Sequence, residues 1–350
     1  RYFLSKGEST TIIAPQGSWV ANECKKDGAI LAAYDYDQVV SQDDENMKTW
    51  ADGLKDCDVA VCTVHPPRET FHCSVFAAEC IKKYGLKTVL IPKTGTIVPE
   101  YARAFYLPEP SIRSTVIAIT DFTRKYLLDT YKIPSDMVEL IYQGTEVDRF
   151  TADESRMPEA LARYRLSEAA SPILGCVGVF EERKGQTILL QAVSQLAREI
   201  FPGIHLMFVG EGPDEEMLKD KIHEMSLEEN VSLFPFTREP EYVFERIDIL
   251  VLSSLRKEGL PNVLLEAMSM GIPVVSSKLA GVPEVVKNGE TGFMVTPGNA
   301  AELAQAIEKL WFDKIGYREM ARNARRLMET KFDKKQQFDA FLRYFHRIAG

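Results

Sequence analysis

The sequence contains no apolar run of about 18 residues or more, so no segment is long enough to cross a bilayer as a helix. Residues 1–7 also lack the apolar core of a secretory signal peptide. Basic residues are outnumbered, because 42 Lys and Arg face 51 Asp and Glu, and the net charge is −9 at pH 7. This balance argues against a nucleic-acid-binding protein. It is compatible with a small polyanionic ligand, which needs only local cations and aligned amides.

The cysteines do not form a pattern typical of disulfides or metal sites. Neither a CxxC pair nor a clustered framework is present, which argues against structural zinc and against any metal centre. Reduced thiols in the interior are expected, and hence a reducing, cytoplasmic compartment. The six residues are Cys24, Cys57, Cys62, Cys73, Cys80 and Cys176.

Short apolar runs alternate with helix-length amphipathic stretches along the whole chain. A length of 350 residues suggests two domains, and 45% hydrophobic with 27% charged residues is typical of a globular protein. Continuous apolar runs with helices between them predict an α/β protein with doubly wound parallel sheets. The predicted strands are Thr10–Pro15, Ile30–Tyr34, Val59–Val64, Thr88–Pro92, Thr115–Thr120, Val138–Tyr142, Ile173–Val177, His205–Val209, Val231–Phe234, Ile249–Leu252 and Ile272–Ser276.

Four parts of the chain are distinguished by composition. Residues 1–150 form a first Rossmann-like domain, the polar stretch 151–171 a linker, 172–330 a second domain, and 331–350 a closing amphipathic helix. Residues 1–5 read like the end of a helix, and Lys6-Gly7 like its stop. Since a doubly wound domain normally opens with a strand, we expect a fragment of a longer chain that lacks a central strand of the first sheet.

Glycine-bearing loops follow four predicted strands of the second domain. They are Gly178–Gly185, Gly210–Pro213, Glu258–Pro261 and Ala280–Pro283. In an open parallel sheet the carboxyl ends of the strands form the ligand crevice, and glycine lets the backbone approach a ligand closely. One such loop is an ordinary turn, but four in one sheet indicate a site whose amides hold phosphate oxygens.

Two carboxylates and two cations stand out within these loops. Glu266 is flanked by apolar residues and is the only ionisable residue between Glu258 and Lys278. A carboxylate in such a helix either faces solvent, pairs internally, or accepts hydrogen bonds from a ligand's paired hydroxyls, such as a ribose diol. Arg183 and Lys184 either form a solvated pair or offset the charge of a phosphate.

Together these segments resemble the retaining GT-B glycosyltransferases of the group 1 (family 4) type, which share a Glu-x7-Glu motif. The motif is Glu258 to Glu266, within 258–275 (EGLPNVLLEAMSMGIPVV), and it is followed by 280–286 (AGVPEVV). Residues 175–185 and 208–213 (FVGEGP) are also similar to the family. The resemblance is strong over roughly 171–300 and weaker over 5–150, where APQGSW, DVAVCTVH and IYQGTEVDRF (141–150) carry it.

The resemblance implies two facing Rossmann-like domains with a cleft between them, the closing helix crossing back to the first. The second domain binds a UDP- or GDP-sugar, and the first binds a glycan, lipid-linked or small-molecule acceptor. Transfer proceeds with retention, by front-face attack and without an obligatory metal or other cofactor. Glu258, Lys184 and Arg183 are the implied catalytic residues. The implied donor-binding residues are Glu266, Gly178, Gly210, Glu211, Gly259, Leu260, Pro261 and Asn262.

The chain departs from the family pattern at two positions. Val179 stands where an arginine often follows the glycine, and the stretch 91–95 has Lys93 but no histidine. Because of the first departure, it is open which residue supplies the second positive charge for the diphosphate, and Arg183 is a candidate substitute. The second leaves open the contacts that the first domain makes with the donor sugar. His65 falls where the family often has a histidine near the cleft and is a candidate cleft residue, although a lone histidine at a strand end is more often structural.

Two other functions remain open. A phosphorylase or nucleotide-sugar epimerase would keep the architecture, but phosphorolysis needs a further phosphate site, and no extra basic cluster is evident. A catalytically silent, donor-binding partner subunit is favoured by the departures and disfavoured by the intact 258–266 segment. Association with the cytoplasmic face of a membrane is compatible with the sequence, but Lys82-Lys83 and Arg124-Lys125 are too few for a basic patch.

Overall fold

The structure is a computed structural model that describes residues 1–35, 44–64, 72–95 and 102–350. Its contacts divide the chain into two compact units. Unit 1 comprises Arg1–Tyr142 with Gln336–Gly350, and unit 2 comprises Gln143–Lys335. Among the described residues, no helix has the length and apolarity that crossing a membrane requires.

Unit 2 is built on a six-stranded sheet in which every pair of neighbours is parallel. The strand order is β12-β11-β10-β7-β8-β9, so the chain starts in the middle, runs out to one edge, and returns to the other side of its first strand. This is the classic doubly wound order. The strands are β7 (Ile173–Val177), β8 (His205–Val209), β9 (Val231–Phe234), β10 (Ile249–Leu252), β11 (Val274–Ser277) and β12 (Gly292–Val295).

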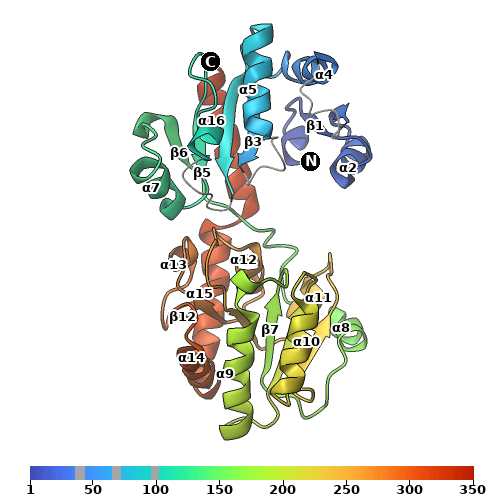
Figure 1. Ribbon diagram of the computed structural model, residues 1–350, viewed down its shortest axis with the longest axis vertical. Coiled ribbons are helices and arrows are strands. Elements are labelled where there is room, and N and C mark those ends of the chain that lie inside the picture. Colours follow the sequence, from blue (N-terminus) through green and yellow to red (C-terminus); the bar gives the residue numbers. More distant parts are fainter. Residues whose placement is uncertain (36–43, 65–71, 96–101) are drawn as a thin grey trace. The chain divides into compact units, whose positions relative to one another are not determined.

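Helices lie on the flanks of this sheet (Figure 1). In α9, Leu189, Leu190, Val193 and Leu196 recur at the spacing of one helix face, and all four are buried in the main core of unit 2. Helix α12 packs against β10, β11 and α15. The helices and turns are η3 (Glu154–Arg156), α8 (Met157–Arg163), η4 (Glu182–Lys184), α9 (Gln186–Glu199), α10 (Glu215–Glu224), α11 (Glu241–Phe244), α12 (Asn262–Ser269), α13 (Val282–Val285), α14 (Ala300–Phe312) and α15 (Lys314–Lys331).

The predicted strands of the second domain are confirmed, four of them to the residue. Residues 205–209, for example, form β8 within their predicted bounds. The prediction missed β12, Gly292–Val295, which has only four residues, begins with glycine, and is half-exposed at Phe293 and Met294. A short edge strand carries too little apolar pattern to be recognised without its neighbour.

Unit 1 holds two parallel sheets rather than the single sheet we expected. Strand β1 pairs only with β2, and β3-β4-β5-β6 form a separate sheet among the described residues. The parallel α/β character is confirmed, but β1 and β3 each lack a second neighbour within those sheets. The strands are β1 (Thr11–Pro15), β2 (Ile30–Tyr34), β3 (Val59–Val64), β4 (Val89–Thr94), β5 (Val116–Ala118) and β6 (Val138–Leu140).

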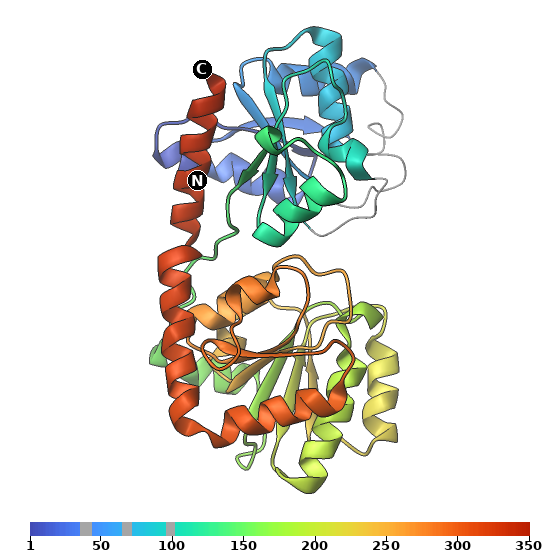
Figure 2. The same ribbon diagram turned by 90° about the vertical axis from the view of Figure 1, so that its left-hand side faces the viewer.

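The last helix, α16 (Lys334–Ala349), packs on the sheet of unit 1 (Figure 2). Phe341 and Tyr344 are buried against Val89, Ile91 and Ile117. The hydroxyl of Tyr344 is 2.5 Å from Thr115 Oγ1. The other helices and turns of unit 1 are α1 (Tyr2–Ser5), α2 (Trp19–Asp27), α4 (Asp44–Leu54), α5 (Cys73–Tyr84), α6 (Arg103–Tyr106), α7 (Asp121–Asp129) and η2 (Ser135–Met137).

The division into units places the stretch 151–171, which we expected to be a linker, within unit 2. Unit 2 begins at Gln143, next to Gly144, near which we expected the linker to begin. Ala160 of α8 is fully buried, and α8 packs on α11. Because the stretch 151–171 as a whole is rich in polar residues, the packing of this one short helix was not evident from composition.

Candidate functional site

The strongest candidate site lies at the carboxyl ends of β7 and β10, the two neighbouring strands at which the strand order reverses. The loop after β7 runs from Gly178 to Gly185, and the loop after β10 runs from Ser253 to Pro261. Ligands of open α/β sheets bind at this switch point. The two loops are joined by hydrogen bonds from Leu255 N to Arg183 O (2.7 Å) and from Ser253 Oγ to Lys184 O (3.0 Å).

A buried charge pair connects the same two loops. Lys184 Nζ donates to Glu258 Oε1 at 2.7 Å, and Ser254 Oγ donates to the same oxygen at 2.7 Å. The guanidinium of Arg183 is 3.7 Å from that oxygen and also pairs with Glu181. Glu258 is only 6% exposed, so its carboxylate depends on these partners. The structure thus brings the three expected catalytic residues together.

The entrance of α12 presents unpaired backbone donors. Among the described residues, no acceptor lies within hydrogen-bond reach of the N–H groups of Gly259, Leu260 and Asn262. Helix α12 begins at Asn262 after Pro261, and no side chain caps it. Unsatisfied N–H groups at a helix start, with the positive end of the helix dipole, attract anions. Lys184 and these amides therefore form a candidate phosphate site.

The backbone amides of Gly178 and Gly210 are used within the fold. Their N–H groups donate to Val209 O and Phe234 O, both at 3.0 Å, so neither amide is available to a phosphate. A Cβ on Gly210 would lie 1.9 Å from Gly178 O. These glycines allow the loops after β7 and β8 to touch, which shapes the site without contributing amides. Glu211 lies in the same contact and is exposed.

Gly185 permits the equivalent contact with the β10 loop. It adopts φ +67°, and a Cβ there would lie 2.2 Å from Ser253 O. We expect Gly185→Ala to lower the free energy of unfolding by about 3 kcal/mol or more, because the clash is with backbone and adds to the strain of a positive φ.

Gly289→Ala is the matched control for this prediction. Gly289 has φ +79° with nothing within 4 Å of the added Cβ, so only the conformational strain remains. Its expected cost is about 1 kcal/mol. Urea denaturation of both variants measures the difference, and equal losses would contradict the close packing of the two loops.

Glu266 lies on α12, half-buried. No described residue donates a hydrogen bond to its carboxylate or pairs with it within 4 Å. Burial raises the pKa of Glu266 to about 7, the positive charge of Arg149 opposes this shift, and the negative charge of Glu241 adds to it. The Glu266 carboxylate is therefore neither fully exposed to solvent nor paired with another described residue.

Two residues that approach this site were not among the predicted site residues. Arg149 NH2 pairs with Glu241 at 2.8 Å and donates to Arg238 O at 2.8 Å. Gln143 Nε2 donates to Leu260 O at 3.1 Å. Both residues lie within the 141–150 segment that carried part of the resemblance. Because they act over long sequence separations, no local spacing pointed to them.

Two positions that the sequence singled out, the candidate residue His65 and the departure at Lys93, belong to unit 1. Lys93 lies on β4 in register with Thr63 and Ile117, and burial lowers its pKa. His65 lies outside the described residues. In unit 2, Val179 is 37% exposed, and its carbonyl accepts a hydrogen bond from Gln186. Neither observation tests the roles that the sequence suggested.

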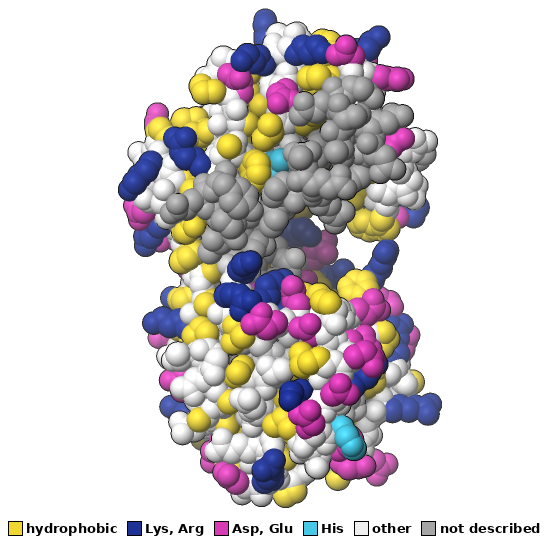
Figure 3. Space-filling view, in the orientation of Figure 1, with side chains coloured by type: hydrophobic (Ala, Val, Ile, Leu, Met, Phe, Trp, Pro, Cys, Tyr) yellow, Lys and Arg dark blue, Asp and Glu magenta, His cyan; other side chains and the backbone are white. Residues whose placement is uncertain are grey.

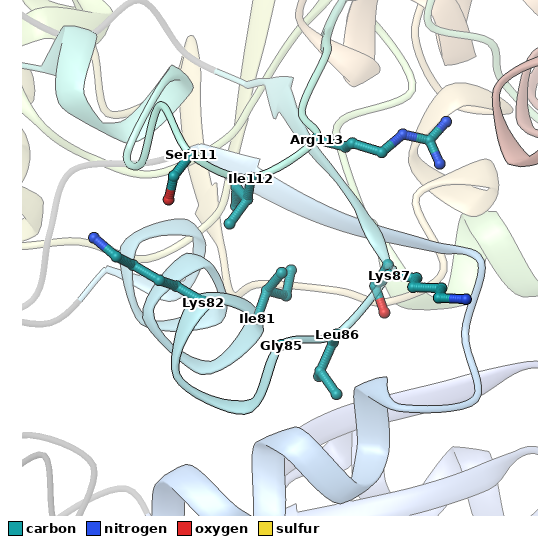
Figure 4. A pocket seen from close by; sticks show the side chains of 9 residues that line it. Ile81, Lys82, Gly85, Leu86, Lys87, Ser111, Ile112 and Arg113 are labelled. Carbon is teal, nitrogen blue, oxygen red and sulfur yellow. The ribbon is translucent and has the colours of Figure 1, made fainter.

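A hollow of about 490 Å³ lies in unit 1 near the start of β4. Lys82 and Arg113 point to opposite sides of it (Figure 4). Lys82 is paired with Glu109 at 2.7 Å. The cations therefore do not converge on one point, in contrast to Lys184 and Arg183. The hollow is lined by Ile81, Lys82, Gly85, Leu86, Lys87, Thr88, Ser111, Ile112 and Arg113.

On the face drawn in Figure 3, acidic and basic side chains of unit 2 are intermingled. Among the described residues, no group of three or more His, Cys, Asp or Glu is placed to hold a metal ion.

The chain is similar to known proteins in sequence and in fold. Residues 162–327 match the sequence model of the family "Glycosyl transferases group 1". The chain is 28% identical over 207 residues to a GDP-mannose-dependent alpha-(1-6)-phosphatidylinositol monomannoside mannosyltransferase of Mycobacterium tuberculosis, covering 57% of this chain and 53% of that protein. It is 26% identical over 254 residues to the lipopolysaccharide core biosynthesis glycosyltransferase LpsE of Rhizobium meliloti, covering 72% of each.

Solved structures share the fold along nearly the whole chain. A glycosyltransferase from Rickettsia africae has a TM-score of 0.84 at 20% identity, covering 99% of this chain and 92% of that one. HepE of Anabaena in complex with UDP has a TM-score of 0.82 at 18% identity, covering 97% and 100%. The chain spans about half the length of the mycobacterial mannosyltransferase. Over residues 162–327 the chain resembles the group 1 glycosyltransferases, and it has the two-domain, parallel-sheet GT-B fold.

Proposed function

We propose that this protein is a retaining glycosyltransferase that moves a sugar from a UDP- or GDP-sugar to a glycan, lipid-linked or small-molecule acceptor. One observation carries the proposal. The Lys184–Glu258 pair lies next to the unpaired amides of Gly259, Leu260 and Asn262 at the switch point of the unit 2 sheet. The relatives support it, since one is named as GDP-mannose-dependent and HepE was solved with UDP.

The leaving group of such a reaction is a nucleoside diphosphate. Its negative charge grows as the bond to the sugar breaks, so fixed positive charge and oriented amides lower the barrier. Lys184 supplies the charge, with Arg183 beside it. Because the Lys184 ammonium is already held by Glu258, it needs little reorganisation when the diphosphate arrives. We expect no obligatory metal, and transfer that persists in EDTA is the corresponding assay result.

Glu266 is assigned to the ribose of the donor. An ionised carboxylate has two oxygens, and each accepts a hydrogen bond from one hydroxyl of a diol. Its carboxylate has no donor among the described residues, so ligand hydroxyls would satisfy a group that is otherwise buried at a cost.

Front-face attack with retention is consistent with the hydrogen bonds that the Glu258 carboxylate accepts. Its Oε1 accepts hydrogen bonds from both Lys184 and Ser254, which makes it a poor nucleophile. This supports a contact to the donor sugar rather than a covalent intermediate. The anomeric configuration of the first product, read by NMR, tests this directly, and an inverted product would contradict it.

A donor screen tests the proposal as a whole. With UDP-, GDP- and ADP-sugars at about 100 times Kd, linkage stabilises the native state by about 2.7 kcal/mol and raises Tm by roughly 5–10 °C. We expect one nucleotide class to give this shift and to release nucleoside diphosphate slowly, by hydrolysis or transfer. No shift with any donor would reject the proposal. A shift without any turnover would favour a silent binding subunit, and turnover dependent on inorganic phosphate would favour a phosphorylase.

A further inference from the structure

The side chain of Gln143 spans the turn that leads into α12. Its Nε2 donates to Leu260 O at 3.1 Å and to Asn262 Oδ1 at 2.5 Å. Both hydrogens of the amide group are thereby used, one on each side of Pro261. Leu260 O can only accept, so the NH2 end of Gln143 must face it. A methyl group or a carboxylate at this position could not replace these bonds.

The residues of the turn itself do not supply hydrogen bonds equivalent to those from Gln143. Pro261 occupies the N-cap position of α12, and no side chain caps the helix. Proline has no N–H to donate. Leu260 is 5% exposed, so its carbonyl lies in a region where an unmade hydrogen bond is costly. The Gln143 amide therefore stabilises a turn whose own residues cannot close it.

The same bond sets the orientation of the Asn262 side chain. Since Asn262 Oδ1 accepts from Gln143, the Nδ2 group is the end that is left over. No described residue accepts a hydrogen bond from it. The two hydrogens of the Asn262 amide are thus added to the backbone N–H groups of the turn. Among the described residues, none of these donors has an acceptor.

Gln143 is itself held firmly by the chain that follows it. Thr145 N donates to Phe332 O at 2.7 Å, and Lys334 N donates to Thr145 O at 2.8 Å. At Gly144 a Cβ would lie 2.7 Å from Lys334 N, so the two segments touch backbone to backbone. A fixed backbone reduces the entropy that the Gln143 side chain loses on forming its two bonds.

We propose that Gln143 is a positioning residue for the donor diphosphate. It holds the Leu260–Asn262 turn and turns the Asn262 amide so that its donors face an anion. The proposal rests on the proposed function, because it names the group that preorganises the same anion site. Gln143 does not touch the substrate in this scheme, and it acts through the turn.

Gln143→Met removes the amide at nearly constant volume, and Gln143→Asn shortens it by one methylene. We expect kcat to fall about 10-fold to 100-fold in Gln143→Met, because a displaced donor no longer meets the charge that grows on the leaving group. Donor KM should change less than threefold. Gln195→Met is the matched control, since Gln195 bonds only within α9 to Glu199 at 3.3 Å, and its kinetics should be unchanged.

A double-mutant cycle distinguishes positioning from general loss of structure. If Gln143 acts through Asn262, Gln143→Met should cost far less in an Asn262→Ala background than in the wild type. Additive effects, or wild-type kcat in Gln143→Met, would overturn the proposal. If Gln143→Met does not fold, the same double-mutant cycle is measured with Gln143→Asn, and its coupling with Asn262→Ala tests the proposal in the same way. A wild type that binds no nucleotide at all would reject the proposed function, whereas an active wild type with an active Gln143→Met rejects only this inference.

Discussion

Lys184→Met is expected to lower kcat by about two to three orders of magnitude, with a smaller change in donor KM. The ammonium lies 2.7 Å from Glu258 at the mouth of the phosphate site, so it is placed to meet charge that develops on a leaving diphosphate. Removing one preorganised donor of this kind costs about 10²–10³ in kcat. Steady-state kinetics with the donor identified by the thermal screen measures the effect.

The same substitution destabilises the protein, and this has to be separated from catalysis. Without Lys184, the buried Glu258 carboxylate keeps only Ser254 and the more distant Arg183, which costs up to about 3 kcal/mol. In the double variant Lys184→Met/Glu258→Gln the uncompensated charge is gone. Stability should therefore recover in part while kcat stays low.

Lys219→Met provides the matched control. Lys219 lies on α10, exposed and paired with Glu215 and Glu216, so its loss should alter neither kcat nor stability by a large factor. If the folded Lys184→Met variant kept wild-type kcat, the role of Lys184 would be structural only, and the catalytic assignment would fail.

Glu266→Gln is expected to weaken donor binding about 10-fold to 100-fold above pH 7. A hydrogen bond to an ionised group contributes about 1.5–3 kcal/mol, and the neutral amide keeps only one acceptor for the two ribose hydroxyls. Because the pKa of Glu266 is raised to about 7 by burial, wild-type affinity should fall as the pH drops below 7, where the carboxyl is protonated. In Glu266→Gln this dependence should vanish.

The stability of the ligand-free protein should depend on pH in the opposite sense to the donor affinity. The folded protein holds a proton on Glu266 more tightly than the unfolded chain does, because the pKa of this carboxyl is about 7 in the folded state and 4.5 in the unfolded state. The native state therefore binds more protons between these two pKa values, and the free energy of unfolding decreases as the pH rises from about 4.5 to 7. The loss is up to about 3 kcal/mol. Above pH 7, Glu266→Gln without ligand should be more stable than the wild type.

Glu319→Gln on the exposed side of α15 serves as the control, with neither effect expected. Isothermal titration with UDP or GDP at several pH values measures affinity, and urea denaturation over the same range measures stability. A Glu266→Gln variant that binds nucleotide as the wild type does would remove the ribose assignment. If Glu266→Gln were more stable than the wild type but bound UDP or GDP with unchanged affinity, Glu266 would be a buried acid with no role in donor binding.

The secondary structure of unit 2 was determined largely by local sequence. Runs such as 205–209 and 249–252 are continuously apolar because both faces of a parallel sheet are covered, and they became β8 and β10 within their predicted bounds. The apolar flanks of Glu266 likewise predicted a carboxylate in a costly environment, and the raised pKa agrees with that reasoning. These features depend on a few consecutive residues.

Only the tertiary structure decided which backbone N–H groups of the loops are hydrogen-bonded within the fold and which are available to a ligand. The N–H groups of Gly178 and Gly210 were expected to hold phosphate, but they are taken by neighbouring strands, whereas those of Gly259 and Leu260 are left over. In unit 1, strand pairing separated β1-β2 from β3-β6, although the apolar runs looked alike. Gln143 and Leu260 meet across 117 residues of sequence. Hydrogen bonds of this kind depend on which segments the fold places side by side, and a local pattern of residue types does not contain that information.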